Sequence, residues 1–428
     1  MTEWWRRASL PLRRLMWVAG LVALVPGCVG DAAPTRNSPP PTSTLTPTGR
    51  PMATPPPRPT AAPTATPMPT PTPTAMPTPT PVPLPTPIPF WDRRLSSPDA
   101  QGTDSETLVR MLDYIADHEV EAHSVLIVRN GYLVLEAYFH PYHRGRAHRL
   151  TSCTKSFLSA LIGVASEEGH LNLDDKVLGF FPDRTIENHS PLKREVTVEH
   201  LLRMRSGLDW PESSVSYSSA DNILWRMMGS SDWTQFALDR SMAAEPGTAF
   251  NYSTGDPQLL GAVLEEATGL SVTEFARTRL FEPLGVSPAH WSWRASPEGV
   301  AFGGGGLSAT PRAMAKFGYL YLSEGDWNGE QIIPAGWVEA STAEPHYGYQ
   351  WWCLGNGGYA ALGYGGQRIA VMPDLDMVIV VTADMPGATS RYLVDAFILP
   401  AARSSEPLPE NPEALALLEA RVEDIKSP

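Results

Sequence analysis

Residues 149–155 read Arg149-Leu-Thr-Ser-Cys-Thr-Lys155 and open a segment with apolar residues on one face, namely Phe157, Leu158, Leu161 and Ile162. This spacing predicts a helix, and a helix places Ser152 and Lys155 one turn apart on the same side. The first turn offers unpaired N–H groups and the positive dipole end, which favour an oxyanion nearby. A serine hydroxyl needs an adjacent base, and a desolvated lysine can supply one. The same pattern also fits a capping serine followed by an exposed lysine, so the surrounding sequence has to decide.

Segments on both sides of this helix predict strands. Two β-rich stretches, 124–128 and 132–138, flank Arg129-Asn130-Gly131, a strong signal for a hairpin turn. Further strands are predicted at 347–353, 358–362, 368–372 and 377–382, with a turn at 373–376. Helical spacing occurs at 107–118, through most of 151–281, at 389–403 and at 412–425. The order predicts an α+β fold in which an antiparallel sheet flanked by helices carries an all-helical subdomain, at about 156–310.

Several motifs around the Ser-x-x-Lys pair resemble the class C serine β-lactamase family, in family order and over about residues 105–400. They are Thr151-Ser-Cys-Thr-Lys-Ser-Phe157, Val196-Thr-Val-Glu-His-Leu-Leu-Arg-Met-Arg-Ser-Gly-Leu208, Glu245-Pro-Gly-Thr-Ala-Phe-Asn-Tyr-Ser-Thr254, and the segments 168–175, 260–265, 281–285 and 303–308. Three more are most similar to the branch of carboxylesterases and 6-aminohexanoate-oligomer hydrolases: Gly325-Asp-Trp-Asn-Gly329, Tyr349-Gln-Trp-Trp352 and Gly363-Tyr-Gly-Gly-Gln367. The resemblance implies a β-lactamase/transpeptidase-like fold and an acyl-enzyme mechanism without metal or cofactor.

The resemblance also implies roles for individual residues. Ser152 matches the nucleophile and Lys155 its base partner. Tyr252 matches the tyrosine of the second motif, whose phenol would relay a proton to the leaving group. The chain departs from the family at Thr254, where Asn is typical and contacts the substrate amide in β-lactamases. This departure weakens a β-lactam or peptide interpretation and leaves ester cleavage intact, with Thr254 still expected beside the substrate.

The third family motif, Lys or His followed by Thr-Gly on a strand beside the nucleophile, has no counterpart here. The local sequence is Ala361-Leu-Gly-Tyr-Gly-Gly-Gln367, whose glycines suit close approach of backbone to substrate, or a plain turn. By resemblance, the N–H groups of Ser152 and Tyr364 would form the oxyanion hole, and Gly365 would contact substrate. Without a cation at this place a substrate carboxylate is held less well, which counts against carboxypeptidase activity.

Tyr217 lies in a serine-rich segment, 213–220, and is expected at the mouth of the site, as a substrate-loop tyrosine is in the oligomer-hydrolase branch. The alternative is an ordinary surface loop. The pairs His118/His123 and His140/His143 have no obvious third ligand nearby, so no metal site is expected. The Gly-x-Ser-x-Gly elbow of α/β-hydrolases does not occur in the sequence.

The first ninety residues have a different composition. Arginine pairs precede an apolar run at 15–25, which is too short to span a bilayer and predicts a secretory signal over 1–27. Leu24-Val-Pro-Gly-Cys28 resembles a bacterial lipoprotein processing box, which would make Cys28 the lipidated N-terminus of an exported protein on the outer face of the cell membrane. The alternative is an ordinary cleavable signal and a secreted protein.

The segment 28–90 would then be a linker, because 22 of the chain's 44 prolines lie between Pro34 and Pro89 and predict an extended polyproline tract. Residues 1–90 carry a net charge of +5 and the rest −18, within a total of −13. An acidic folded part argues against nucleic-acid binding and leaves the lipid anchor as the only membrane contact. The hydrolase domain is expected at 91–403, with an acidic tail at 404–428. Besides Cys28 the chain has only Cys153 and Cys353, which are too few for a disulfide framework.

The sequence therefore predicts a serine hydrolase that cleaves small ester or amide substrates through an acyl-enzyme on Ser152. Alternatives of the same class are a β-lactamase and a D-alanyl-D-alanine carboxypeptidase. An alternative of another kind is a penicillin-recognising sensor that is acylated without turnover, or a binder of peptidoglycan fragments. The intact set of Ser152, Lys155 and Tyr252 disfavours an inactive binder.

Overall fold

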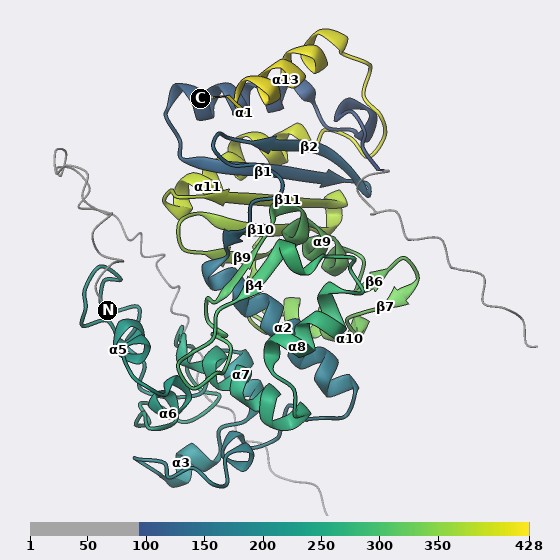
Figure 1. Ribbon diagram of the computed structural model, residues 1–428. Coiled ribbons are helices and arrows are strands. Elements are labelled where there is room, and N and C mark those ends of the chain that lie inside the picture. Colours follow the sequence, from purple (N-terminus) through teal and green to yellow (C-terminus); the bar gives the residue numbers. More distant parts are fainter. Residues whose placement is uncertain (1–93, 428) are drawn as a thin grey trace, which may run out of the picture. The chain divides into compact units, whose positions relative to one another are not determined.

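One antiparallel sheet of six strands organises the protein, whose computed structural model describes residues 94–427 (Figure 1). The predicted signal segment, Cys28 and the proline-threonine linker lie outside these residues. The strand order is β2-β1-β11-β10-β9-β8. The strands are β1 (Ala122–Arg129), β2 (Tyr132–Tyr138), β8 (Trp352–Cys353), β9 (Tyr359–Gly363), β10 (Gln367–Met372) and β11 (Met377–Ala383). Because β1 pairs with β11, early and late segments share one sheet, which confirms the predicted α+β fold.

Two smaller sheets and a set of helices complete the described part of the chain. The remaining strands are β3 (His148–Arg149), β4 (Trp291–Trp293), β5 (Leu307–Ala309), β6 (Asp326–Trp327) and β7 (Glu330–Gln331). The helices are α1 (Ser105–Asp117), α2 (Thr154–Glu167), α3 (Pro191–Arg194), α4 (Val198–Leu202), α5 (Ile223–Met228), α6 (Trp233–Leu238), α7 (Gly255–Thr268), α8 (Val272–Ala276), α9 (Pro311–Leu322), α10 (Ala335–Thr342), α11 (Gly387–Leu393), α12 (Leu399–Ala401) and α13 (Pro412–Asp424). No helix among residues 94–427 is long and apolar enough to cross a membrane.

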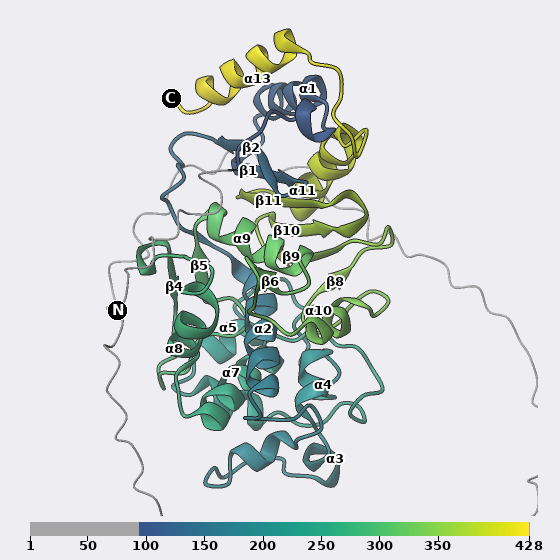
Figure 2. The same ribbon diagram turned by 90° about the vertical axis from the view of Figure 1, so that its right-hand side faces the viewer.

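The main sheet is buried on both faces. In β11, Val378 and Val380 face the core that contains α2 and α9, and Ile379 and Val381 face the core that contains α1 and α11. Figures 1 and 2 show α1 and α13 on one side of the sheet and α2 with α9 on the other. A strand covered on both faces is apolar at every position, which explains the unbroken hydrophobic run of β11.

The β1–β2 hairpin forms as predicted, with Asn130 and Gly131 at φ 50° and 74° as its two turn residues. The predicted strand at 347–353 is shorter in the structure, where only Trp352–Cys353 is extended. Gln350 interrupts it with φ 63°, and its buried amide donates to the carbonyls of Leu201 and Leu202. A buried side chain that ties this segment to α4 therefore replaces strand pairing.

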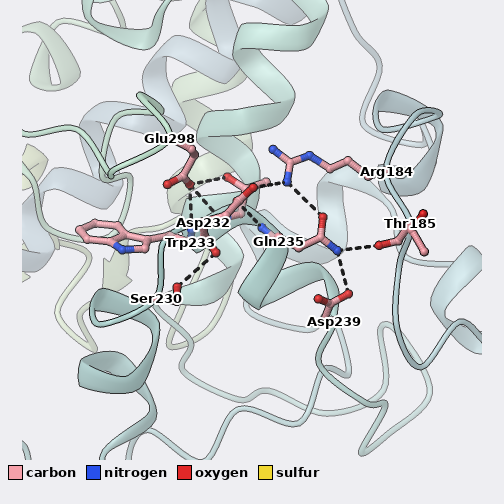
Figure 3. Close-up of polar contacts among 9 residues, drawn as sticks. Arg184, Thr185, Ser230, Asp232, Trp233, Gln235, Asp239 and Glu298 are labelled. Atoms are coloured by element: carbon pink, nitrogen blue, oxygen red, sulfur yellow. Dashed lines mark hydrogen bonds and ion pairs between the residues drawn. The ribbon is translucent and has the colours of Figure 1, made fainter.

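A set of hydrogen bonds and an ion pair joins segments of the helical part at the N-terminus of α6 (Figure 3). Asp232 caps the helix by accepting from Gln235 N, and Glu298 accepts from the backbone N–H groups of Trp233 and Thr234. Arg184 donates to Asp232 at 2.7 Å. Carboxylates suit a helix N-terminus, whose N–H groups are unpaired. These contacts join three separate segments of the chain at one helix end.

The C-terminal segment packs against the first helix of the described chain. Leu418 of α13 is buried in the same core as α1, and Arg421 pairs with Asp113 at 2.6 Å. The predicted helix at 412–425 thus corresponds to α13. It packs against α1 and β2, on the opposite face of the sheet from α2 (Figure 2).

Candidate active site

Ser152 lies in a single 3-10 turn, Thr151–Cys153, that leads directly into α2. One turn later Lys155 projects from the same side, and its Nζ donates to Ser152 Oγ at 3.1 Å. The lysine is only 1% exposed although it carries the longest polar side chain of the helix. A hydroxyl beside a water-excluded amine is the arrangement that nucleophilic catalysis by serine requires.

The residue before the nucleophile is held in an unusual conformation. Thr151 has φ 48°, a region that β-branched residues rarely adopt and that costs on the order of 1–3 kcal/mol. Its Oγ1 lies 2.8 Å from Leu150 O and 3.2 Å from Tyr364 O. A Cβ on Gly363 would come within 2.3 Å of this same Oγ1. The nucleophile turn and the end of β9 are therefore in direct contact.

Lys155 Nζ has two further acceptors in the described structure. It donates to Gly304 O at 2.8 Å and lies 3.5 Å from Thr254 Oγ1. It also lies over the ring of Tyr252, at 5.0 Å from the ring centroid. The structure thus brings Thr254 and Gly304, which lie 99 and 149 positions from Lys155 in the sequence, to the same amine. The Gly304 carbonyl was not among the predicted site residues, although its glycine run belonged to the motifs that carry the resemblance.

Aromatic side chains form one wall of the site beside Tyr252. Trp352 stacks on the Tyr252 ring at 5.8 Å, and Tyr347 meets it edge-on at 6.3 Å. Burial raises the pKa of Tyr347 well above its usual value, so this phenol stays protonated at neutral pH. Phe250 extends the wall outward and is 43% exposed. This wall suits an apolar or aromatic part of a substrate.

On the side of Thr254 lies a residue that no sequence motif indicated, Glu212. Its side chain is buried, and its carboxylate accepts from Thr254 and from the hydroxyl of Tyr217. Tyr217 is 36% exposed, and burial followed by the Glu212 charge raises its pKa. A lone glutamate in a loop has no sequence signal of its own, because its partners at 217 and 254 become visible only in the fold.

The predicted oxyanion strand is the end of β9. Tyr364 follows Gly363 directly, is 74% exposed, and its ring lies 6.2 Å from that of Tyr217. Gly365 and Gly366 have φ 80° and 82° and close the β9–β10 hairpin, so both positions require the conformational freedom of glycine. Gly365 O accepts from Met385 N, which anchors this loop on the segment after β11.

Other candidate groups lie outside this cluster. Cys153 and Cys353 are free thiols, and burial raises the pKa of Cys153 to about 12. His123 stacks on Tyr142 at 3.7 Å, close to His148. Within residues 94–427 no group of three or more His, Cys, Asp or Glu side chains could hold a metal ion.

Comparison with known proteins agrees with this fold. The family model described as Beta-lactamase matches residues 109–402, which is more than half of the chain. The protein therefore belongs to the β-lactamase family and is a serine hydrolase of that family, as the sequence motifs predicted.

The individual relatives are hydrolases and a penicillin-binding protein homologue. A 6-aminohexanoate-dimer hydrolase of Paenarthrobacter ureafaciens is 25% identical over 293 residues, 62% of this chain and 74% of the relative. Several other curated relatives are matched over only 36% of their length. The octameric penicillin-binding protein homologue of Pyrococcus abyssi superposes with a TM-score of 0.54 at 23% identity, over 71% of this chain and 79% of that one. EstCE1, a hydrolase with promiscuous acyltransferase activity, superposes with a TM-score of 0.56 at 18% identity, over 70% of this chain and 99% of that one.

Proposed function

We propose that the protein hydrolyses small, uncharged esters or amides through an acyl-enzyme on Ser152. The observation that carries the proposal is the 3.1 Å contact between Ser152 Oγ and the buried Nζ of Lys155. The names of two relatives, an amide hydrolase and an acyl-transferring hydrolase, support acyl chemistry on this fold.

The residues around Ser152 suit each step of such a reaction. Lys155, in its neutral form, takes the proton of Ser152 as the oxygen attacks the substrate carbonyl carbon. The N–H groups of Ser152 and Tyr364 stabilise the resulting oxyanion. The Tyr252 phenol, whose ring centroid lies 5.0 Å from Lys155 Nζ, passes the proton to the leaving alcohol or amine, and the acyl group remains on Ser152. Water then attacks the acyl-enzyme by the same proton route, which returns Ser152 and releases the acid.

The walls of the site favour neutral substrates over those with a carboxylate. The strand beside the nucleophile, β9 (Tyr359–Gly363), carries no Lys or His, and its Ala361 is 1% exposed and lies in the core. The buried carboxylate of Glu212, in contact with Thr254, repels an anion. Both features disfavour β-lactams and D-alanyl peptides, whose recognition depends on a carboxylate.

The experiment compares Ser152→Ala with Ser159→Ala in the full chain. Both serines are on or beside α2, and Ser159 is buried with no hydrogen-bond partner in the described structure, so it is a matched control. We expect S152A to lose at least ~10³-fold in kcat on p-nitrophenyl acetate and to lose labelling by a fluorophosphonate, while S159A keeps both. Esterase activity that persists in S152A would disprove the assignment. Nitrocefin turnover as fast as ester turnover would instead favour a β-lactamase.

A further inference from the structure

Glu212 occupies a central position in the site that no part of the proposed reaction uses. It belongs to the segment between α4 and α5 and is 1% exposed. Its Oε2 accepts from Trp210 Nε1 at 2.6 Å and from Thr254 N at 2.7 Å. Its Oε1 accepts from Thr254 Oγ1 at 2.8 Å and from the Tyr217 hydroxyl at 2.7 Å. Four donors from three residues therefore converge on one buried carboxylate.

This geometry decides which way two hydroxyl protons point. An ionised carboxylate only accepts hydrogen bonds, and each of its oxygens accepts two of them here. Each hydroxyl has one proton, and both Thr254 and Tyr217 donate theirs to Glu212. The Thr254 hydroxyl therefore has only lone pairs left to offer, and Lys155 Nζ lies 3.5 Å from its oxygen. The Thr254 hydroxyl is thus made an acceptor for the amine.

The consequence reaches the nucleophile through Lys155. Nζ has three oxygens around it, at Ser152, Gly304 and Thr254. In the neutral amine that the reaction uses, two N–H groups donate to Gly304 O and Thr254 Oγ1, which leaves the lone pair for the proton of Ser152. Gly304 O is a carbonyl and always accepts, whereas a threonine hydroxyl free to rotate could direct its own proton at the amine. Glu212 removes that competing orientation and keeps the amine aimed at Ser152.

We propose that Glu212 is the positioning residue of this site: by accepting hydrogen bonds from the hydroxyls of Thr254 and Tyr217, it orients Lys155 toward Ser152 and holds the Tyr217 loop beside Thr254. The proposal rests on the proposed function above. Asn222 closes the same loop, because its Nδ2 donates to Glu212 O and to Val215 O. The ring of Trp225 is also tied to the loop, through Nε1 and Tyr217 O at 2.7 Å.

The charge of Glu212 also acts on its neighbours. The titratable groups around it are Tyr217 on its own segment, Asp256 on α7 and, beyond Thr254, Lys155 on α2. Tyr252, before α7, is a neighbour of Tyr217. Desolvation, with a smaller contribution from Glu212, raises the pKa of Asp256. A negative charge at this place favours the protonated form of a nearby amine. Removal of the charge is therefore expected to displace the pH profile of activity.

The test is Glu212→Gln in the full chain, measured as pH profiles of kcat and kcat/KM on p-nitrophenyl acetate. The amide keeps the shape but has one acceptor oxygen and adds a donor, so the hydroxyls of Thr254 and Tyr217 lose their common partner. We expect kcat to fall by about tenfold or more and the acid limb to move to lower pH by about half a unit or more. Glu212→Asp keeps the charge but not the reach, so its kcat falls while its acid limb stays in place.

The matched control is Glu298→Gln. Glu298 also accepts several hydrogen bonds, but these come from the N-terminus of α6, as Figure 3 shows. We expect it to lower the melting temperature and leave the pH profile of activity unchanged. If E212Q behaves like E298Q, with lower stability and an unmoved acid limb, Glu212 is an anchor of its loop and the proposal is wrong. Wild-type kinetics in E212Q or E212D would overturn it as well.

A double-mutant cycle with Thr254→Val locates the pathway of the effect. If Glu212 acts through the Thr254 hydroxyl, the double variant is no slower than the slower single variant, whereas independent effects multiply. Independent effects on kcat would overturn the route through Thr254. Failure of this proposal can be told apart from failure of the proposed function. An active S152A variant would disprove the hydrolase assignment. An inactive S152A variant together with an E212Q variant of wild-type kinetics would disprove only the role of Glu212.

Discussion

Asp256 shows how a single buried group couples the stability of this protein to pH. The carboxylate is fully buried in the first turn of α7, where its Oδ1 accepts from the hydroxyls of Ser206 and Ser253. Oδ2 has no partner within residues 94–427. Burial raises the pKa of this group from 3.8 to about 7. The folded state therefore holds a proton that the unfolded chain releases at lower pH.

The sign of the pH effect follows from this difference. Between about pH 4 and 7 the folded state binds more protons than the unfolded state, so stability falls as pH rises, by at most ~1.4 kcal/mol per pH unit from this group. Asp256→Asn keeps the acceptor oxygen and has no charge to bury. We expect D256N to match the wild type near pH 4 and to be more stable at pH 8, in urea melts at both values. A stability difference that does not grow with pH would contradict this account.

At the scale of elements, the contact between β9 and the nucleophile turn decides the geometry of the proposed oxyanion hole. Gly363 lies so close that an added Cβ would be 2.3 Å from Thr151 Oγ1 and 2.4 Å from Leu150 O. Gly363→Ala must push β9 away from Ser152 and move the Tyr364 N–H with it. We expect kcat to fall by about 10²-fold with a small change in melting temperature, since one oxyanion donor is worth about that much.

The control for this strand is Gly355→Ala. Gly355 lies in the loop between β8 and β9 and has nothing within 4 Å of an added Cβ. It should keep wild-type kcat. Equal losses in G355A and G363A would show that the whole hairpin region is sensitive, and that the contact with Thr151 has no special role.

Local signals predicted elements well and relations between elements poorly. Three features were predicted because each depends on residues that are neighbours in the sequence: the Asn130-Gly131 turn, the apolar strand β11 and the helix after Ser152. The strand expected at 347–353 was mostly wrong, because the buried amide of Gln350 bonds α4 instead. Glu212 was missed because its partner Thr254 is 42 positions away. Ser152, Lys155 and Tyr252 were named through motif resemblance, and composition alone would not have selected them.

At the scale of the whole molecule, the chain joins an acidic hydrolase domain to an N-terminal segment of opposite charge. Residues 1–90 carry +5 and the remainder −18. An acidic surface is repelled by an anionic membrane, so stable association needs an anchor that the domain itself does not provide. Lipid attached at Cys28 would be such an anchor, and the proline-threonine tract would separate it from the domain.

This arrangement predicts that anchoring and catalysis separate in one substitution. In a bacterial host fed radioactive palmitate, the wild-type chain should incorporate label and sediment with membranes, because acyl chains bury apolar surface at about 0.8 kcal/mol per CH₂. Cys28→Ser should lose both the label and the sedimentation. Its kcat on a soluble ester should stay at the wild-type value, because Ser152, Lys155 and Tyr252 all lie within the described domain. Cys353→Ser, which removes a free thiol of that domain, should keep the label. Label that persists in C28S would place the acyl group elsewhere, and an unlabelled wild type that appears in the medium would favour an ordinary cleaved signal.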